Sequence, residues 1–265
     1  MLGEWSKVSR PVIGMIHLPP LPASPGFSGT LEAIKKAVLL DAAALVAGGV
    51  HGLMIENFGD VPFYPRRVPA HVVATMTALA MDVRRKFDVP LGINVLRNDG
   101  QSALAIAHAV GARFIRVNVL CGARVADQGL IQGIAHDLLR ERAILEASEI
   151  KILADVDVKH SAALAPRSLA DEVEDTIERG LADAVIVSGT GTGKATDPSH
   201  VATVKAAARG QPVFVGSGVT AASIGQYLPH ADGFIVGTAF KAGDDPRKPV
   251  EIQRVKALLG RLSAG

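Results

Sequence analysis

The chain has 265 residues, of which 48% are hydrophobic and 20% charged, which suits a single domain with a large core. A formal net charge of +2, with basic residues spread along the chain, gives no electrostatic indication of nucleic-acid binding. One cysteine, Cys121, excludes an internal disulfide framework and indicates a cytoplasmic protein, while charges interrupt every apolar run before the ~18 residues of a membrane span.

Strand-like and helix-like segments alternate along the chain. The predicted strands are 11–17, 52–56, 90–96, 114–119, 151–158, 184–187, 213–215 and 234–236. The predicted helices are 30–46, 69–87, 100–110, 129–148, 168–179, 198–208, one that starts at 221, and 249–262. Eight strand-then-helix units, at a mean spacing of roughly 33 residues, predict one (β/α)₈ TIM barrel over residues 1–265, with a doubly wound open sheet as the alternative.

Two glycine turns follow the last two predicted strands. Glycine lets the backbone approach a ligand closely, and the N–H groups of such a turn can point at an anion. The loops after strands seven and eight are where barrels of this class bind phosphate. The predicted phosphate-binding residues are Gly216, Ser217, Gly218, Gly237 and Thr238.

The loop after strand six, 188–194, is rich in glycine and hydroxyl groups and ends in a lysine. It is not a P-loop, because Ser188 stands where the first glycine is required and Ala195 where a serine or threonine is required. Such a loop suits closure over a phosphorylated ligand, and we expect Ser188, Thr190 and Gly191 to contribute to binding.

Alternation along strand five places three charged side chains, Asp155, Asp157 and Lys159, on one face. Charges cannot face packed helices at low cost, so these residues should line the barrel mouth. The polar residues at the ends of strands two to four should meet them there, at the face that carries the active site in this fold. These are Glu56, Asn57, Asn94, Arg116 and Asn118.

The charged cluster favours acid/base chemistry. Asp155 and Asp157 would raise each other's pKa while Lys159 opposes the rise, so one carboxylate could act as acid or base while the other stays ionised. Glu56 is a second candidate acid or base, or a salt-bridge partner of Arg116. His17, at the end of strand one, is either a ligand or proton shuttle or a structural histidine.

No resident metal or cofactor is expected from the sequence. Glu56, Asp155 and Asp157 could hold Mg²⁺ jointly with a substrate phosphate, but no zinc-binding spacing occurs.

Four segments resemble the BtpA/SgcQ family: PVIGMIHLPPLPASP (11–25), MIENFGDVPF (54–63), IRVNV (115–119) and ADVDVKH (154–160). The resemblance runs nearly end to end and implies a phosphate-binding (β/α)₈ barrel. Cyanobacterial members are linked to photosystem I biogenesis as peripheral membrane factors, and other members accompany sugar-metabolism genes. The barrel is also similar to phosphoribosylanthranilate isomerase, whose base is a cysteine ending strand one and whose acid is an aspartate on strand five. Here His17 ends strand one, and Asp155 or Asp157 could fill the second role.

Two functions therefore remain open. The first is an enzyme that acts on a phosphorylated sugar or nucleotide-like metabolite by isomerase- or hydrolase-type acid/base chemistry. The second is a non-catalytic, membrane-peripheral assembly or stability factor of the photosystem I biogenesis type, whose aromatic loop 58–64 contacts a partner. We expect a phosphorylated small-molecule ligand, no nucleic acid and a homo-oligomer, with the apolar helix 72–81 either in the core or at an interface.

Overall fold

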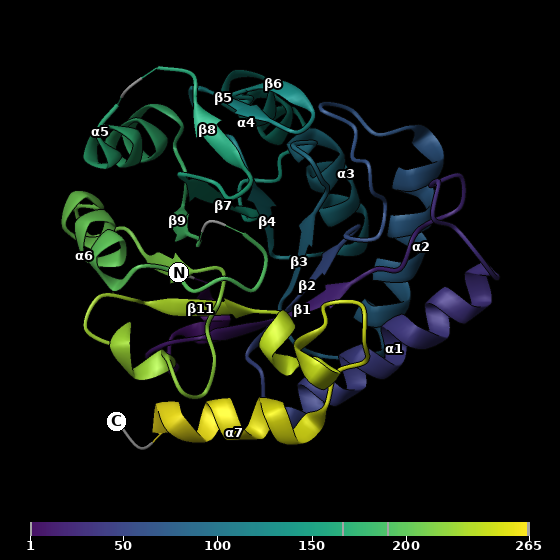
Figure 1. Cartoon of the computed structure of the whole chain (residues 1–265). Helices are drawn as coiled ribbons and strands as arrows, with labels where there is room; N and C mark the ends of the chain where they lie inside the picture. Colours follow the sequence, from purple (N-terminus) through teal and green to yellow (C-terminus); the bar gives the residue numbers. More distant parts are fainter. Residues whose placement is uncertain (1, 166, 190, 264–265) are drawn as a thin grey trace.

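The computed structural model describes residues 2–165, 167–189 and 191–263. Within these residues, eight parallel strands close into a barrel in the order β1, β11, β10, β9, β7, β4, β3, β2 and back to β1 (Figure 1). The predicted TIM barrel is confirmed. The barrel strands are β1 (Val12–His17), β2 (Gly52–Glu56), β3 (Leu91–Asn94), β4 (Phe114–Val117), β7 (Lys151–Val156), β9 (Ala184–Val187), β10 (Val213–Val215) and β11 (Gly233–Val236).

The α-helices of the described chain surround the barrel (Figure 1). They are α1 (Leu31–Gly48), α2 (Ala70–Lys86), α3 (Gly100–Val110), α4 (Ala135–Ile144), α5 (Leu169–Glu174), α6 (Pro198–Ala207) and α7 (Ile252–Ser263), and α5 continues as a π-helix, Asp175–Arg179. Local sequence sets their ends, as α1 illustrates. Thr30 Oγ1 accepts a hydrogen bond from Ala33 N at 3.2 Å, and Gly49 ends the helix at φ 97°. No described helix is long and apolar enough to cross a bilayer.

The helix predicted over 129–148 is wrong in its first part. β5 (Ala123–Ala126) and β6 (Gly129–Gln132) form an antiparallel hairpin, β8 (Ser161–Ala163) adds a third strand, and the helix begins only afterwards. Gly129 has φ 91°, a conformation that suits a turn and not a helix. The hairpin covers a small cluster of Val119, Ile131 and Val158, so burial against distant parts of the chain decided the strand state.

The helix predicted from residue 221 does not form. Between β10 and β11 the described chain has turns and a short 3₁₀ helix, Ile224–Gln226. Gly225 and Pro229 fall in this segment, and both disfavour an α-helix. Thr220 still accepts a hydrogen bond on its Oγ1 from a backbone N–H three residues later, at 3.1 Å.

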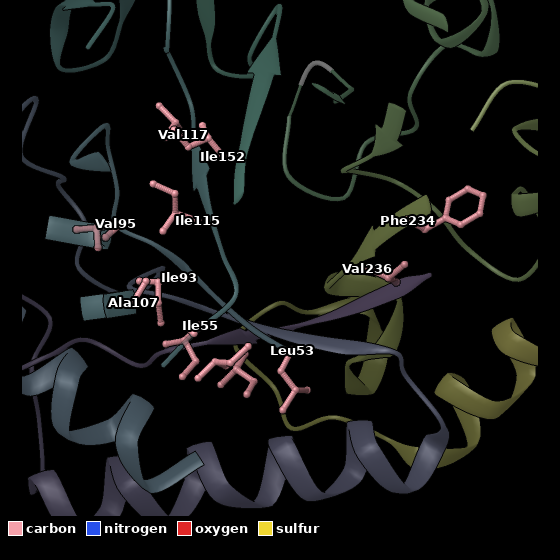
Figure 2. Close-up of a cluster of buried hydrophobic side chains, with 14 of the residues drawn as sticks. Leu53, Ile55, Ile93, Val95, Ala107, Ile115, Val117, Ile152, Phe234 and Val236 are labelled. Carbon is pink, nitrogen blue, oxygen red and sulfur yellow. The ribbon is translucent and has the colours of Figure 1, made fainter. Parts of the chain in front are cut away.

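Each barrel strand divides its side chains between two parts of the core. On β2, Leu53 and Ile55 point outward and pack in the layer between strands and helices (Figure 2). Met54, between them, belongs to the cluster inside the barrel. Glu56 continues the inward series, because side chains alternate along a strand. The pleat of β2 therefore carries the Glu56 carboxylate to the barrel axis at the carboxyl-terminal end.

Trp5 covers the other end of the barrel. Its ring centroid lies 5.7 Å from that of Phe114 and 6.3 Å from that of Phe214, and its Nε1 donates a hydrogen bond to the His51 carbonyl at 2.7 Å. Trp5 is buried among the side chains inside the barrel. The amino-terminal end is thus closed by packing.

The apolar side of helix α2 packs against the core. Val72, Met76 and Leu79 are buried and belong to the cluster between strands and helices. The sequence left open whether helix 72–81 packs in the core or forms an interface. In the structure these three side chains pack in the core.

Candidate functional site

A cavity of about 110 Å³ opens at the carboxyl-terminal ends of the barrel strands. The turns after β10 and β11 form part of its lining, and side chains from β1, β2, β4 and the segment after β7 form another part. The predicted site residues that line it are His17, Glu56, Arg116, Lys159, Gly216, Ser217, Gly218, Gly237 and Thr238. The barrel thus brings the glycine turns and the ionisable side chains to the same opening.

Three glycines of the two turns stand where a side chain does not fit. A Cβ on Gly216 would lie 2.4 Å from a side-chain atom of β9, and one on Gly237 would lie 2.7 Å from Cε1 of His17. Gly218 has φ 66°, and its Cβ would lie 2.2 Å from the carbonyl oxygen of Lys194. These positions need glycine because the backbone packs closely against its neighbours.

Three consecutive N–H groups in the turn after β10, those of Ser217, Gly218 and Val219, have no hydrogen-bond partner within the part of the chain that the structure describes. All three residues line the cavity, and Ser217 and Val219 are buried. Buried N–H groups without partners are rare because they cost free energy. Successive N–H groups in a turn with positive φ form a concave site for anions, so this turn suits a phosphate oxygen.

Arg116 of β4 and Asp155 of β7 form a buried, bidentate ion pair. Arg116 Nε donates to Oδ2 of Asp155 at 2.8 Å, and its Nη2 donates to Oδ1 at 2.7 Å. Asn118 Nδ2 donates to Oδ2 at 2.9 Å, and Ser188 Oγ donates to Oδ1 at 3.0 Å. Because a carboxylate accepts about four hydrogen bonds, the acceptor capacity of Asp155 is filled. Burial opposes the charge of Arg116, but Asp155 raises the pKa of the guanidinium overall.

Glu56 lies between His17 and Asn94. Its Oε2 accepts a hydrogen bond from Asn94 Nδ2 at 2.6 Å, and its Oε1 lies 3.9 Å from His17 Nε2. His17 Nδ1 lies 3.2 Å from the Pro246 carbonyl, so Nδ1 carries the proton and Nε2 keeps its lone pair. Phe58 stacks on the imidazole at 4.6 Å. Burial lowers the pKa of His17 from 6.5 to about 4, although Glu56 opposes this, so the imidazole is neutral at pH 7.

Lys159 reaches the cavity from the segment after β7. Arg97 Nη2 donates a hydrogen bond to the Lys159 carbonyl at 2.5 Å and so anchors its backbone. Nζ of Lys159 forms no hydrogen bond or ion pair with the described residues. Burial first, and then the positive charge of Arg116, lower the pKa of Lys159 from 10.5 to about 8, against the opposing effect of Glu56 and Asp155.

Asp157 does not join this cluster. β7 ends one residue earlier, and φ 48° at Asp157 breaks the alternation on which its predicted orientation depended. Its Oδ1 accepts a hydrogen bond from Arg124 Nη2 at 2.5 Å, and its N–H donates to Glu172 Oε1 at 2.8 Å. The expectation that Asp155 and Asp157 share one face is therefore wrong.

The carboxylates considered for Mg²⁺ are likewise not brought together. Asp157 pairs with Arg124 outside the cavity, and Asp155 is occupied by Arg116. Over the ranges 2–165, 167–189 and 191–263, no group of three or more His, Cys, Asp or Glu side chains is placed to hold a metal ion. The joint site with Glu56 is thus not supported.

The remaining predicted residues lie beside the cavity or away from it. Ser188 supports Asp155, and the carbonyl of Gly191 accepts a hydrogen bond from Ser217 Oγ at 3.1 Å. Asn57 lines a second cavity, of about 350 Å³, and its Oδ1 accepts a hydrogen bond from the N–H of Leu96 at 2.7 Å. Thr190 lies outside the described residues.

Several residues at the site were not predicted from the sequence. The sequence places Phe58 in a loop expected to contact a partner, yet its ring stacks on His17. Arg97 and Pro246 hold Lys159 and His17 through backbone carbonyl contacts that no sequence pattern signals. The cavity-lining residues outside the predicted site set are Met15, Thr192, Gly193, Val219, Thr220, Ile235, Val236, Ala239 and Asp244.

Solved structures with this fold share little sequence with the chain. N-(5'-phosphoribosyl)anthranilate isomerase from Pyrococcus furiosus superposes with a TM-score of 0.60 at 12% identity, covering 97% of this chain and 100% of that one. Phosphoribosyl anthranilate isomerase from Thermus thermophilus gives 0.58 at 12% identity, covering 96% and 98%. At this identity the likeness shows the barrel fold alone.

Sequence relatives are much closer. The sequence model of the BtpA family matches residues 8–263. Photosystem I biogenesis protein BtpA of Synechocystis sp. is 47% identical over 264 residues, covering 100% of this chain and 92% of that protein. An uncharacterised protein of Thermococcus kodakarensis is 45% identical, covering 94% of each chain. The chain therefore belongs to the BtpA family, as its four sequence motifs indicated.

Proposed function

We propose that the chain is an enzyme that binds a phosphorylated sugar or nucleotide-like metabolite and transforms it by acid/base chemistry of the isomerase or hydrolase type. The observation that carries the proposal is the row of three N–H groups, at Ser217, Gly218 and Val219, that have no hydrogen-bond partner among the described residues. They lie in the cavity that also holds Glu56 and Lys159. An anion bound there would leave the rest of the ligand beside ionisable side chains.

Within this proposal, Glu56 and His17 transfer the proton. His17 offers an Nε2 lone pair at neutral pH, and Oε1 of Glu56 lies 3.9 Å from it. A substrate atom between the two groups, or a small movement of either side chain, could bridge this distance. The filled acceptors of Asp155 support a different role for it, which is to hold Arg116 in place. Asp157, which the sequence suggested as an alternative acid or base, lies outside the cavity.

The phosphate site is tested by Gly218→Ala. The new Cβ would meet the Lys194 carbonyl and would sit at φ 66°, so the turn must change shape and lose its anion-binding N–H groups. We expect binding of inorganic phosphate and of ribose 5-phosphate, measured by calorimetry, to weaken at least about tenfold, or roughly 1.4 kcal/mol.

Gly225→Ala is the matched control, because a Cβ there meets nothing within 4 Å. It should bind phosphate as the unmodified chain does, and circular dichroism should show both variants folded. Equal binding by the two variants, or no binding of phosphate compounds by the unmodified chain, would remove the basis of the proposal.

The catalytic role is tested by Glu56→Gln, which keeps the shape of the side chain and the bond to Asn94 while removing the carboxylate. A panel of phosphosugars and nucleotides is screened for binding by thermal shift and then for turnover. For a ligand that is turned over, we expect the variant to lose roughly a hundredfold in kcat with little change in phosphate affinity. A variant with full kcat would take Glu56 out of the chemistry.

The alternative role is an assembly or stability factor of the photosystem I biogenesis type, peripheral to a membrane. It is favoured by the name of the relative that is 47% identical over this chain, and by Val61 and Tyr64, which are exposed in the loop after β2. A phosphate ligand that binds tightly and is never turned over would support this role over the enzyme.

The proposal also covers the location, the oligomeric state and the ligands of the protein. We place the protein in the cytoplasm as a single-domain homo-oligomer that needs no resident metal and binds no nucleic acid. The single cysteine supports the cytoplasmic assignment, and the near-neutral charge supports the absence of nucleic-acid binding. Light scattering would report the oligomeric state.

A further inference from the structure

Lys159 stands across the barrel from His17. In the closed strand order, β1 and β7 are separated by β11, β10 and β9 on one side and by β2, β3 and β4 on the other (Figure 1). Lys159 follows β7 and His17 ends β1, and both line the same cavity. A ligand in the cavity therefore lies between the lysine amine and the His17 imidazole, beside the glycine turns.

The amine of Lys159 takes no part in holding the described fold together. Its backbone is anchored by Arg97, but its Nζ forms no hydrogen bond or ion pair with the described residues. The nearby carboxylate of Asp155 is already occupied by Arg116. A lysine amine in a cavity, close to another cation and without a bonded carboxylate, is in the setting in which lysine acts as a nucleophile.

The charge state agrees with this geometry. With its pKa lowered from 10.5 to about 8, Lys159 is neutral in about a tenth of molecules at pH 7. The neutral amine, which is the nucleophilic form, is then roughly a few hundred times more abundant than on a lysine of ordinary pKa.

We propose that Lys159 forms a Schiff base with the carbonyl carbon of a phosphorylated aldehyde or ketone. The inference rests on the proposed function, because the phosphate must be held by the turn after β10. The amine adds to the carbonyl carbon and forms the N–C bond, and one amine proton passes to the oxygen. A second proton, from solvent, lets that oxygen leave as water, so an iminium remains. Addition of water to the iminium later restores the carbonyl and the amine.

The iminium decides which chemistry follows. It withdraws electrons from the adjacent carbon, so a proton there can leave while its bonding electrons form an enamine. A carbon fragment bonded there can leave in the same way, as an aldehyde or ketone, when the hydroxyl group on its own carbon gives up a proton. His17 Nε2 and Glu56, on the far side of the cavity, can take the proton. The substrate class is thereby narrowed to phosphorylated carbonyl compounds, and the reaction to isomerisation or reversible carbon–carbon cleavage.

The test uses the full chain with glyceraldehyde 3-phosphate and sodium cyanoborohydride at pH 7, followed by intact mass and peptide mapping. We expect one adduct per chain, heavier by the mass of the aldehyde less one oxygen, at Lys159. Its labelling should be roughly a hundredfold faster than that of Lys86, an exposed lysine at the end of α2 that does not line the cavity. An excess of inorganic phosphate should slow the labelling. Lys159→Arg should lose the fast labelling, whereas Lys86→Arg should be labelled at Lys159 like the unmodified chain.

Peptide mapping of the labelled, unmodified chain tests the Schiff base even if Lys159→Arg fails to fold. Labelling at Lys159 that is no faster than at Lys86 overturns the Schiff base. Calorimetry with inorganic phosphate on the same samples separates the two proposals. If phosphate binds and Lys159 is not labelled, only the Schiff base is excluded. If phosphate does not bind and does not slow the labelling, both proposals fail.

Discussion

Replacing Asp155 by Asn is expected to lower the free energy of unfolding by about 3–5 kcal/mol, the usual cost of breaking a buried ion pair by removing one partner. Arg116 would stay charged in the barrel interior, where its side chain is 2% exposed, with one good acceptor in place of two. The new amide would also set its own N–H donors against those of Arg116 and Asn118. Guanidinium chloride unfolding, followed by circular dichroism, measures the change.

Asp157→Asn is the matched control, two residues along the same segment. Asp157 is 53% exposed in its side chain, and its partner Arg124 keeps a second carboxylate, Glu172. We expect a loss below about 1 kcal/mol, because exposed ion pairs contribute little. Equal losses for the two variants would contradict the structural role of Asp155. An Asp155→Asn chain of full stability that has lost turnover would restore Asp155 as the acid or base that the sequence suggested.

The second large effect is a dependence of stability on pH that arises from His17. Its pKa is about 4 in the folded chain and 6.5 in the unfolded chain, because folding buries the imidazole. Between these values the unfolded chain binds a proton that the folded chain does not, so the free energy of unfolding rises with pH across this window. The contribution is fully present above pH 6.5 and is lost as the pH falls towards 4. It amounts to about 3 kcal/mol.

Chemical unfolding at a series of pH values from 4 to 7, with His17→Gln beside the unmodified chain, measures this effect. The variant should show a shallower pH dependence, and the gap between the two curves should open only over this window. His108→Gln, on the exposed side of α3, should follow the unmodified chain. Lys159 does not affect the comparison between pH 4 and 7. Its pKa is about 8 in the folded chain and 10.5 in the unfolded chain, so it changes the free energy of unfolding only at about pH 8 and above. Parallel curves for His17→Gln and the unmodified chain would show that burial does not hold the imidazole neutral.

Much of the barrel follows from local sequence. The bounds predicted for β2 and α3 agree with the structure, because their alternation, helical spacing and glycine ends are signals carried by neighbouring residues. The same local rules placed the glycine turns after the last two strands and turned Glu56 and Asp155 towards the axis. A closed barrel then requires the ends of all parallel strands to meet on one face.

The partners at that face were decided by the tertiary structure. Alternation holds only while the strand lasts, so it could not reveal that β7 stops before Asp157 and turns that side chain towards Arg124. Arg116 pairs with Asp155 and not with Glu56. The register of β4 against β7 places Arg116 beside Leu153, two residues before Asp155 on the same face of β7, so the long guanidinium side chain reaches that carboxylate. The low pKa of His17 arises from burial, and burial is a property of the folded chain that residue order does not display. The sequence by itself thus determined that Glu56, Arg116 and the two glycine turns reach the barrel mouth. Contacts between distant segments turned Asp157 away and determined the partners and charge states of the others.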